Sequence, residues 1–100
     1  MSHEECCCQR IKERTEEESR QLIHRLNRIE GQIRGIRGMV EKSVYCTDIL
    51  MQVAAASAAL NSFTRELLAS HIRTCVADDI RAGKDETIDE LVQTLQKLMK

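Results

Sequence analysis

The sequence contains no proline and no tryptophan, and it has a single tyrosine, Tyr45, and a single phenylalanine, Phe63. Proline interrupts helices, whereas aromatic and β-branched residues favour strands, so a chain in which they are scarce is predicted to be all-α. A length of 100 residues allows one domain at most. Because few bulky side chains are available for a core, a helical monomer would be thin, and we expect an oligomer.

The sequence also lacks long apolar runs. It has no N-terminal run of the kind found in signal peptides, and no stretch is long enough to cross a membrane. We therefore expect a cytoplasmic protein without a membrane partner. Its five cysteines, an odd number in a reducing compartment, favour metal ligands or reactive thiols over disulfides. No nucleophile with a paired base and no glycine-rich phosphate loop is visible, so we expect no enzymatic activity.

The first 14 residues show no apolar periodicity and are predicted to form a mobile tail, ahead of a single helical domain at residues 15–100. The tail carries three adjacent cysteines, Cys6, Cys7 and Cys8. These thiols are candidates for an auxiliary soft-metal or redox site. Adjacent cysteines alone define no coordination geometry, so a tail without a dedicated role is the alternative.

Three helices are predicted in the rest of the chain. The first covers about residues 15–40, where apolar residues recur at alternating steps of four and three. The second begins near residues 45–48 and continues without Gly or Pro to residue 82, where Gly83 ends it. The third begins at residue 85 or 87, and Thr87 and Glu90 fit a capping box. A helix as long as the second is exposed unless it packs against a partner, which again predicts an oligomer.

The first predicted helix carries a local basic stripe. Residues 20–37 contain five arginines and a single acidic residue, Glu30, although the net charge of the chain is −1. Solvated helix faces usually mix both signs, and arginine is suited to bidentate phosphate contacts, so the stripe favours nucleic-acid binding over a merely solvated face. The predicted DNA contacts are Arg25, Arg28, Arg34 and Arg37, with Arg20 and Arg73 as weaker candidates.

Three other residues suggest a metal site. His71 and Cys75 stand four residues apart, so on a helix they share one face, and Cys46, 25 residues before His71, returns to that face after about seven turns. Because those turns span about 37 Å, the three side chains can meet only between two antiparallel chains. The axis would fall near residues 59–60, after an alanine-rich stretch that permits close approach. A lone Cys or His on such a face is usually a packed core residue, but the three together favour metal or thiol chemistry. Two thiolates and one imidazole suit Cu(I), whereas zinc normally takes a fourth ligand.

At this point the chain resembles the CsoR family of copper-sensing transcriptional repressors, whose relatives sense nickel or cobalt, formaldehyde and persulfides. The resemblance covers about residues 18–100 and rests on three stretches. These are RLNRIEGQIRGI at residues 25–36, YCTDIL at residues 45–50 and HIRTCVAD at residues 71–78. It implies three helices per chain, an antiparallel dimer in which the first two helices form a four-helix bundle, and a tetramer of dimers.

The resemblance also implies residue roles. Copper-sensing members use a Cys from one protomer with a His and a Cys from the other, which match Cys46, His71 and Cys75. A Tyr and a Glu beside the ligands match Tyr45 and, after a one-residue gap, Glu90. The expected function is a repressor that binds operator DNA in the apo form and releases it on binding Cu(I). A copper chaperone is a candidate metal donor.

Alternatives within and outside this family stay open. Nickel-sensing relatives add a His near the start of the first helix, where this chain has none between residues 4 and 23. Persulfide-sensing relatives lack the His that matches His71. A sensor of persulfide, nickel or zinc is one alternative, and a copper-handling or thiol-redox protein without a DNA role is another. The second alternative would leave the five arginines unexplained.

Overall fold

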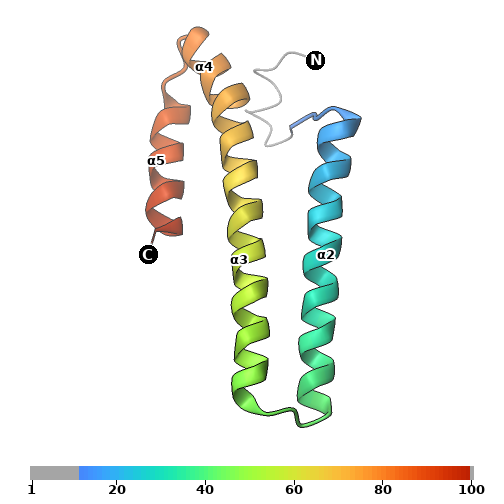
Figure 1. Cartoon of the computed structure of the whole chain (residues 1–100). Helices are drawn as coiled ribbons and strands as arrows, with labels where there is room; N and C mark the ends of the chain where they lie inside the picture. Colours follow the sequence, from blue (N-terminus) through green and yellow to red (C-terminus); the bar gives the residue numbers. More distant parts are fainter. Residues whose placement is uncertain (1–11, 100) are drawn as a thin grey trace. The chain divides into compact units, whose positions relative to one another are not determined.

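The computed structural model describes residues 12–99, and every regular element in this part of the chain is helical (Figure 1). The elements are α2 (Glu16–Glu41), α3 (Cys46–His71), the π-helix η1 (Ile72–Val76), α4 (Ala77–Arg81) and α5 (Glu86–Leu98). The all-α prediction is therefore confirmed. The first predicted helix corresponds to α2, the second to the uninterrupted helical run α3–η1–α4, and the third to α5.

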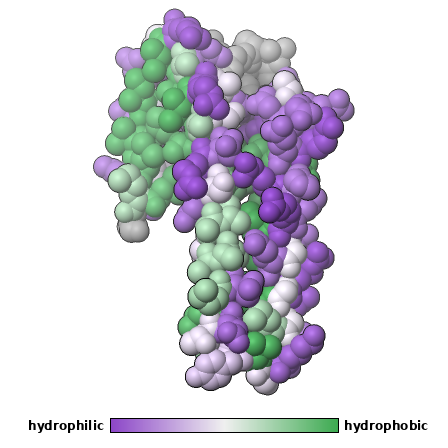
Figure 2. All heavy atoms as spheres, viewed as in Figure 1, coloured by the Kyte–Doolittle hydropathy of each residue, from purple (hydrophilic) through white to green (hydrophobic). Residues whose placement is uncertain are grey.

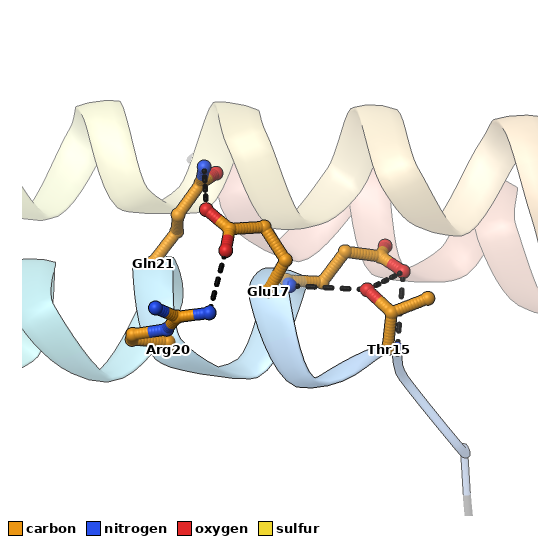
Figure 3. Close-up of polar contacts among 5 residues, drawn as sticks. Thr15, Glu17, Arg20 and Gln21 are labelled. Carbon is orange, nitrogen blue, oxygen red and sulfur yellow. Dashed lines mark hydrogen bonds and ion pairs between the residues drawn. The ribbon is translucent and has the colours of Figure 1, made fainter.

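The first helix begins with a capping box. Thr15 is the N-cap of α2, and its hydroxyl oxygen accepts the backbone N–H of Glu18 at 3.1 Å, while the Glu18 carboxylate accepts the backbone N–H of Thr15 at 3.3 Å (Figure 3). These contacts satisfy two backbone donors that the first turn leaves unpaired. Acidic residues fill that first turn and complement the positive end of the helix dipole. Local chemistry thus fixes where α2 starts.

Helices α2 and α3 belong to one compact unit, residues 14–67, in which they lie side by side and run in opposite directions (Figure 1). Between them, Ser43 adopts a positive φ of 57°. The backbone N–H groups that follow α2 bond back to its last turn, from Ser43 to Val40 at 3.1 Å and from Val44 to Met39 at 3.0 Å. This short link reverses the chain between the first and second predicted helices.

The second helical run differs from the prediction near its C-terminal end. The Ala77 N–H donates to the Ile72 carbonyl, five residues earlier, and the segment Ile72–Val76 is a π-helix. Each π-turn accommodates an extra residue, so side chains beyond it are rotated from the positions that an unbroken α-helix would give them. The predicted stop is confirmed, because Gly83 has a φ of 81° and its N–H and that of Lys84 bond to Ile80 and Asp79. This is a Schellman-type helix end, for which glycine is favoured.

The start of α5 corrects the predicted capping box at Thr87 and Glu90. The N-cap is Asp85, and no side-chain hydrogen bond caps the helix there. The Thr87 hydroxyl instead donates to the carboxylate of Asp79 on α4, whose residue is only 4% exposed. A buried carboxylate needs hydrogen-bond donors, so this tertiary contact prevailed over the local cap. It ties α5 to α4 within the unit that contains residues 68–99.

Few side chains are buried within one chain. The buried residues among those that the structure describes are Ile29, Ala56, Cys75, Val76 and Asp79. Many large apolar side chains are exposed, and a hydrophobic area extends over α5 in Figure 2. The exposed set includes Ile23, Leu26, Ile33, Val40, Leu50, Met51, Val53, Leu60, Ile72, Ile80, Ile88, Val92, Leu98 and Met99. Both compact units, residues 14–67 and the unit of residues 68–99 with residues 12 and 13, thus carry uncovered apolar surface.

Two further sequence expectations concern the chain as a whole. No helix within residues 12–99 is long and apolar enough to span a bilayer. The predicted mobile tail at residues 1–14 falls mostly outside the described residues, and the division into a tail and a single domain at residues 15–100 stays a prediction.

Candidate metal and nucleic-acid sites

The three predicted metal ligands lie on the α3–η1 run. Cys46 is the first residue of α3 and is an exposed free thiol, and Tyr45 directly before it is 73% exposed. His71 is the last residue of α3, and Cys75 lies in η1. Cys46 lies where α3 begins and His71 lies where it ends. The loop before Cys46 and the π-helix after His71 therefore determine where these ligands lie.

His71 and Cys75 lie within one helical turn of each other. His71 is half-buried, whereas Cys75 is buried with 2% exposure. A π-turn holds more residues than an α-turn, so four steps still return close to the starting face. The spacing that predicted a shared face is therefore preserved, although no residue pattern indicates the π-helix itself. π-Helices occur frequently at functional sites.

Cys46 is separated from the other two candidates by the length of α3. That helix has 26 residues, and at about 1.5 Å per residue its ends are separated by far more than a coordination distance. Within residues 12–99, no three side chains of His, Cys, Asp or Glu come together in a group that could hold a metal ion. One chain brings together His71 and Cys75 and leaves Cys46 apart.

The surroundings of Cys75 include two residues that sequence reasoning missed. Thr74 donates its hydroxyl to the Ser70 carbonyl at 2.7 Å, and this hydroxyl lies 3.9 Å from the Cys75 sulfur. The ammonium group of Lys12, from the start of the described chain, donates to the same Thr74 oxygen. These residues are 62 positions apart, and no local pattern in a sequence pairs residues so distant.

The other residues predicted near the metal lie on separate elements. Tyr45 precedes α3, and Glu90 lies half-buried in α5. Their roles beside the ligands stay predictions. Cys6, Cys7 and Cys8 lie outside the described residues.

The predicted basic stripe divides into free and engaged side chains. Arg28, Arg34 and Arg37 are exposed on α2, and Arg73 is exposed on η1. Arg20 forms an ion pair with Glu17 at 2.6 Å, one turn away on α2, and Glu17 also accepts the side-chain N–H of Gln21 (Figure 3). Exposed pairs of this kind contribute little stability, so Arg20 can exchange this partner for another anion.

Arg25 is held differently, by two residues of α3. Its guanidinium donates to the hydroxyl of Ser62 at 3.1 Å and lies 3.9 Å from the carboxylate of Glu66. The side chains of Arg25 and Glu66 are 40% and 57% exposed. Arg25 therefore links α2 to α3 inside residues 14–67, a role that the charge pattern alone did not reveal.

Comparison with known proteins identifies the family. The family model described as metal-sensitive transcriptional repressor matches residues 18–97. The chain belongs to this family of metal-sensitive transcriptional repressors. The resemblance seen in its three sequence stretches is thereby confirmed.

Members of this repressor family with similar sequences include copper sensors. The chain is 43% identical to the copper-sensing transcriptional repressor CsoR of Bacillus subtilis (strain 168) over 91 residues, which is 90% of each protein. It is 44% identical over 59 residues to the copper-sensing transcriptional repressor RicR of Mycobacterium tuberculosis (strain ATCC 25618 / H37Rv), a match that covers 59% of this chain and 62% of RicR.

Two solved structures of transcriptional regulators share the fold. The crystal structure of the copper-sensing repressor CsoR with Cu(I) from Geobacillus thermodenitrificans NG80-2 matches with a TM-score of 0.86 and 43% identity, over 90% of this chain and 95% of that one. The nickel-responsive transcriptional regulator InrS matches with a TM-score of 0.68 and 35% identity, over 78% of this chain and 89% of InrS.

Proposed function

We propose that this repressor senses Cu(I): it binds operator DNA in the metal-free form and releases the DNA when Cu(I) binds. The observation that carries the proposal is the donor set on the α3–η1 run, two thiols and one imidazole. Thiolate and imidazole are soft ligands that suit Cu(I), and a set of three matches its low coordination number. The 43% identity to a copper-sensing repressor over 90% of the chain supports the same effector.

The proposed site lies between two chains. Cys46 of one protomer would join His71 and Cys75 of its partner, because the ends of α3 are too far apart to bind one ion together. Two antiparallel copies of α3 place the start of each helix beside the end of the other. Tyr45 would then lie next to the shared site, and Glu90 is proposed to support it from α5.

The uncovered apolar surface supports an oligomer. Large side chains along α2 and α3, such as Ile33, Leu50 and Leu60, are at least 45% exposed in one chain. Contiguous apolar surface of this kind marks an interaction site. We propose that α2 and α3 of two chains form an antiparallel four-helix bundle and that such dimers associate into a tetramer.

The proposed DNA contacts are phosphate contacts from α2. Arg28, Arg34 and Arg37 are exposed, and an arginine fork matches phosphate oxygens bidentately. Arg25, Arg20 and Arg73 are the further candidates, the first two after giving up the partners described above. We propose that the repressor acts in the cytoplasm, where its operator DNA lies. It acts by binding and does not catalyse a reaction. A copper chaperone is a candidate donor of the metal.

Cu(I) and DNA are proposed to oppose each other through the crossing of the helices. When Cys46 binds together with His71 and Cys75 of the partner, the relative positions of the two α3 helices become fixed. Each α3 packs against its own α2, so the arginines of the two protomers move with that crossing. By linkage, DNA must then weaken Cu(I) binding by the same factor, typically about 5- to 150-fold.

Fluorescence anisotropy tests the proposal. The probe is a labelled duplex from the promoter of the protein's own gene, titrated with protein under anaerobic conditions before and after one equivalent of Cu(I). We expect tight binding by the apo protein, weaker binding by the copper form, and a steep loss of affinity with salt. Equal DNA affinity of the two forms would refute the sensor, in favour of copper storage or thiol chemistry.

Nickel sensing is the second candidate, because the chain is 35% identical to the nickel-responsive InrS. Nickel(II) prefers more nitrogen ligands or a four-ligand planar set, and the proposed set has one imidazole. The same titration with Ni(II) in place of Cu(I) separates the candidates. We expect Ni(II) to leave the DNA complex intact, and release by Ni(II) but not Cu(I) would reverse the assignment.

A further inference from the structure

The contact between Lys12 and Thr74 brings a positive charge next to Cys75. The Thr74 hydroxyl donates to the Ser70 carbonyl at 2.7 Å, and its oxygen accepts a hydrogen bond from the Lys12 ammonium group. The same hydroxyl oxygen lies 3.9 Å from the sulfur of Cys75. A hydrogen bond separates its heavy atoms by about 3 Å, so the ammonium group lies within about 7 Å of this sulfur. All of these side chains belong to one compact unit.

Solvent screens this charge only in part. Lys12 and Thr74 are half-buried, and Cys75 is 2% exposed, whereas Arg73 on η1 is exposed and its charge is screened more strongly. Partly buried charges are also screened less by salt than exposed ones. At about 7 Å and an effective dielectric constant of about 20, one positive charge strengthens the binding of one negative charge by roughly tenfold or more. The Lys12 ammonium group can therefore change the affinity of a metal site that contains Cys75.

The net charge of the proposed metal site depends on the ion that it binds. Cys46 and Cys75 release their protons when a metal binds them, and His71 binds as a neutral imidazole. Two thiolates, a neutral imidazole and Cu(I) together carry one negative charge. The same donors with a divalent ion are neutral. A nearby ammonium group thus stabilises the Cu(I) complex and leaves the divalent complex nearly unaffected.

We propose, building on the Cu(I) sensor described above, that Lys12 is a specificity-determining residue of the metal site. Its ammonium group, held on the Thr74 hydroxyl, favours monovalent Cu(I) over divalent ions such as Zn(II) and Ni(II). Donor type alone does not separate these ions, because thiolate and imidazole bind zinc as well as copper. A fixed positive charge adds a second criterion, the charge of the ion. Thr74 is the positioning residue, since its hydroxyl holds Lys12 beside Cys75.

Metal titrations test the preference for a monovalent ion. The reduced wild type, Lys12→Gln and Lys12→Arg are titrated anaerobically with Cu(I) and, separately, with Zn(II), each against a chelator for that ion. We expect Lys12→Gln to weaken Cu(I) binding about tenfold and to change Zn(II) affinity by less than about twofold, because the Zn(II) complex is neutral. Lys12→Arg keeps the charge and should retain most of the Cu(I) affinity. Equal weakening of both metals in Lys12→Gln, or no weakening, would overturn the proposal.

Lys97→Gln is the matched control for the loss of one positive charge. Lys97 is exposed near the C-terminal end of α5, in the same compact unit as Lys12. We expect the affinities of this variant for both metals to equal those of the wild type, and circular dichroism checks that each variant is folded. If Lys97→Gln lost as much Cu(I) affinity as Lys12→Gln, only the net charge of the chain would matter, and the specific role of Lys12 would be wrong.

A double-mutant cycle tests the positioning role of Thr74. Thr74→Val removes the hydroxyl, and Thr64→Val is the control, because each of these hydroxyls donates to a carbonyl four residues earlier. We expect Thr74→Val to lose Cu(I) affinity selectively, as Lys12→Gln does, and the double variant to lose no more than either single variant. Thr74→Ser should retain the wild-type affinity. Additive losses would mean that Thr74 does not act through Lys12.

DNA release separates this proposal from the sensor itself. If the copper-loaded wild type releases operator DNA and Lys12→Gln loses affinity for Cu(I) and Zn(II) equally, the sensor stands and the role of Lys12 is wrong. If Lys12→Gln loses Cu(I) affinity selectively but Cu(I) does not release DNA from the wild type, the sensor is wrong. Lys12 then still determines which ionic charge the metal site prefers.

Discussion

Arg25 and Arg34 lie on the same helix and differ in what their guanidinium groups contact. Arg25 donates to Ser62 and lies near Glu66, both on α3, whereas Arg34 is exposed to solvent. Charge patterning alone assigned both to DNA. At the scale of single residues, the partners of each arginine indicate whether it contacts DNA phosphate or links two helices. Substitution of each arginine tests this distinction.

Replacing Arg34 by Ala should weaken DNA binding across all sequences and flatten its salt dependence. Each phosphate contact that is lost lowers the slope of log affinity against log salt by about one unit. The free energy of unfolding should change by less than about 0.5 kcal/mol, because the residue is exposed. Anisotropy titrations over a series of salt concentrations measure the slope, and an unchanged slope would indicate a structural role.

Arg25→Ala serves as the contrasting variant. It removes a hydrogen bond between α2 and α3, so we expect about 1 kcal/mol of destabilisation in urea unfolding. The ion pair with Glu66 adds little, because its two side chains are 40% and 57% exposed. If Arg25→Ala were as stable as Arg34→Ala, the contacts of Arg25 with α3 would contribute nothing to the free energy of unfolding.

His71 is predicted to separate copper binding from the response to copper. In His71→Ala the two thiols remain and can hold Cu(I), but the set that fixes the crossing of the α3 helices is incomplete. We expect this variant to bind Cu(I) and remain on DNA. Cys75→Ser is the control, since losing a thiolate should abolish tight binding itself. If copper-loaded His71→Ala released DNA as the wild type does, the imidazole of His71 would not be required for the response to copper.

At the scale of elements, what could be predicted depended on whether the cause was local. The end of the second run at Gly83 was predictable, because a positive φ and the Schellman bonds involve only nearby residues. The resemblance of three short stretches identified the family, and the spacing of His71 and Cys75 predicted their shared turn. The π-helix at Ile72–Val76 was not predictable, because no residue type marks it.

Contacts between residues of different segments of the chain were also not predictable from the sequence. Thr87 looked like the cap of a helix that begins at Asp85, yet it bonds to buried Asp79, eight residues earlier. The link of Lys12 to Thr74 and that of Arg25 to Ser62 likewise depend on the folded chain. Sequence periodicity indicates which face of a helix is apolar. It does not indicate which polar side chains on two different elements form a hydrogen bond.

The contact between Thr87 and Asp79 should stabilise the junction of α4 and α5. Thr87→Val keeps the shape of the side chain and removes the donor to a carboxylate whose residue is 4% exposed. Leaving a buried acceptor without this donor should cost about 1–3 kcal/mol. Thr64→Val is the matched control, because that hydroxyl donates only to the Leu60 carbonyl of its own helix. Equal losses in thermal or urea unfolding would show that the Asp79 contact contributes nothing specific.

At the scale of the whole molecule, the described chain has few buried residues and many exposed apolar ones. Burial of apolar surface contributes about 25 cal/mol per Å² of stability, so a fold with this surface uncovered should be unstable alone. We expect at least a dimer at micromolar concentration, measured by size-exclusion chromatography with light scattering. A folded monomer would contradict this prediction, and with it the shared metal site.

The shared site makes a sharper prediction when two defective chains are mixed. A Cys46→Ala chain keeps His71 and Cys75, whereas a His71→Ala/Cys75→Ala chain keeps only Cys46. In a mixed dimer, one site combines all three intact side chains and the other has none, so high-affinity Cu(I) binding should return at one of the two sites of each mixed dimer. Each variant alone should bind Cu(I) weakly, which competition with a Cu(I) chelator measures before and after the two are unfolded together and refolded. Recovery requires ligands from opposite chains, because neither variant carries all three side chains. If mixed dimers form, as differently tagged subunits can verify, and still bind Cu(I) no more tightly than the separate variants, then each protomer binds its metal alone.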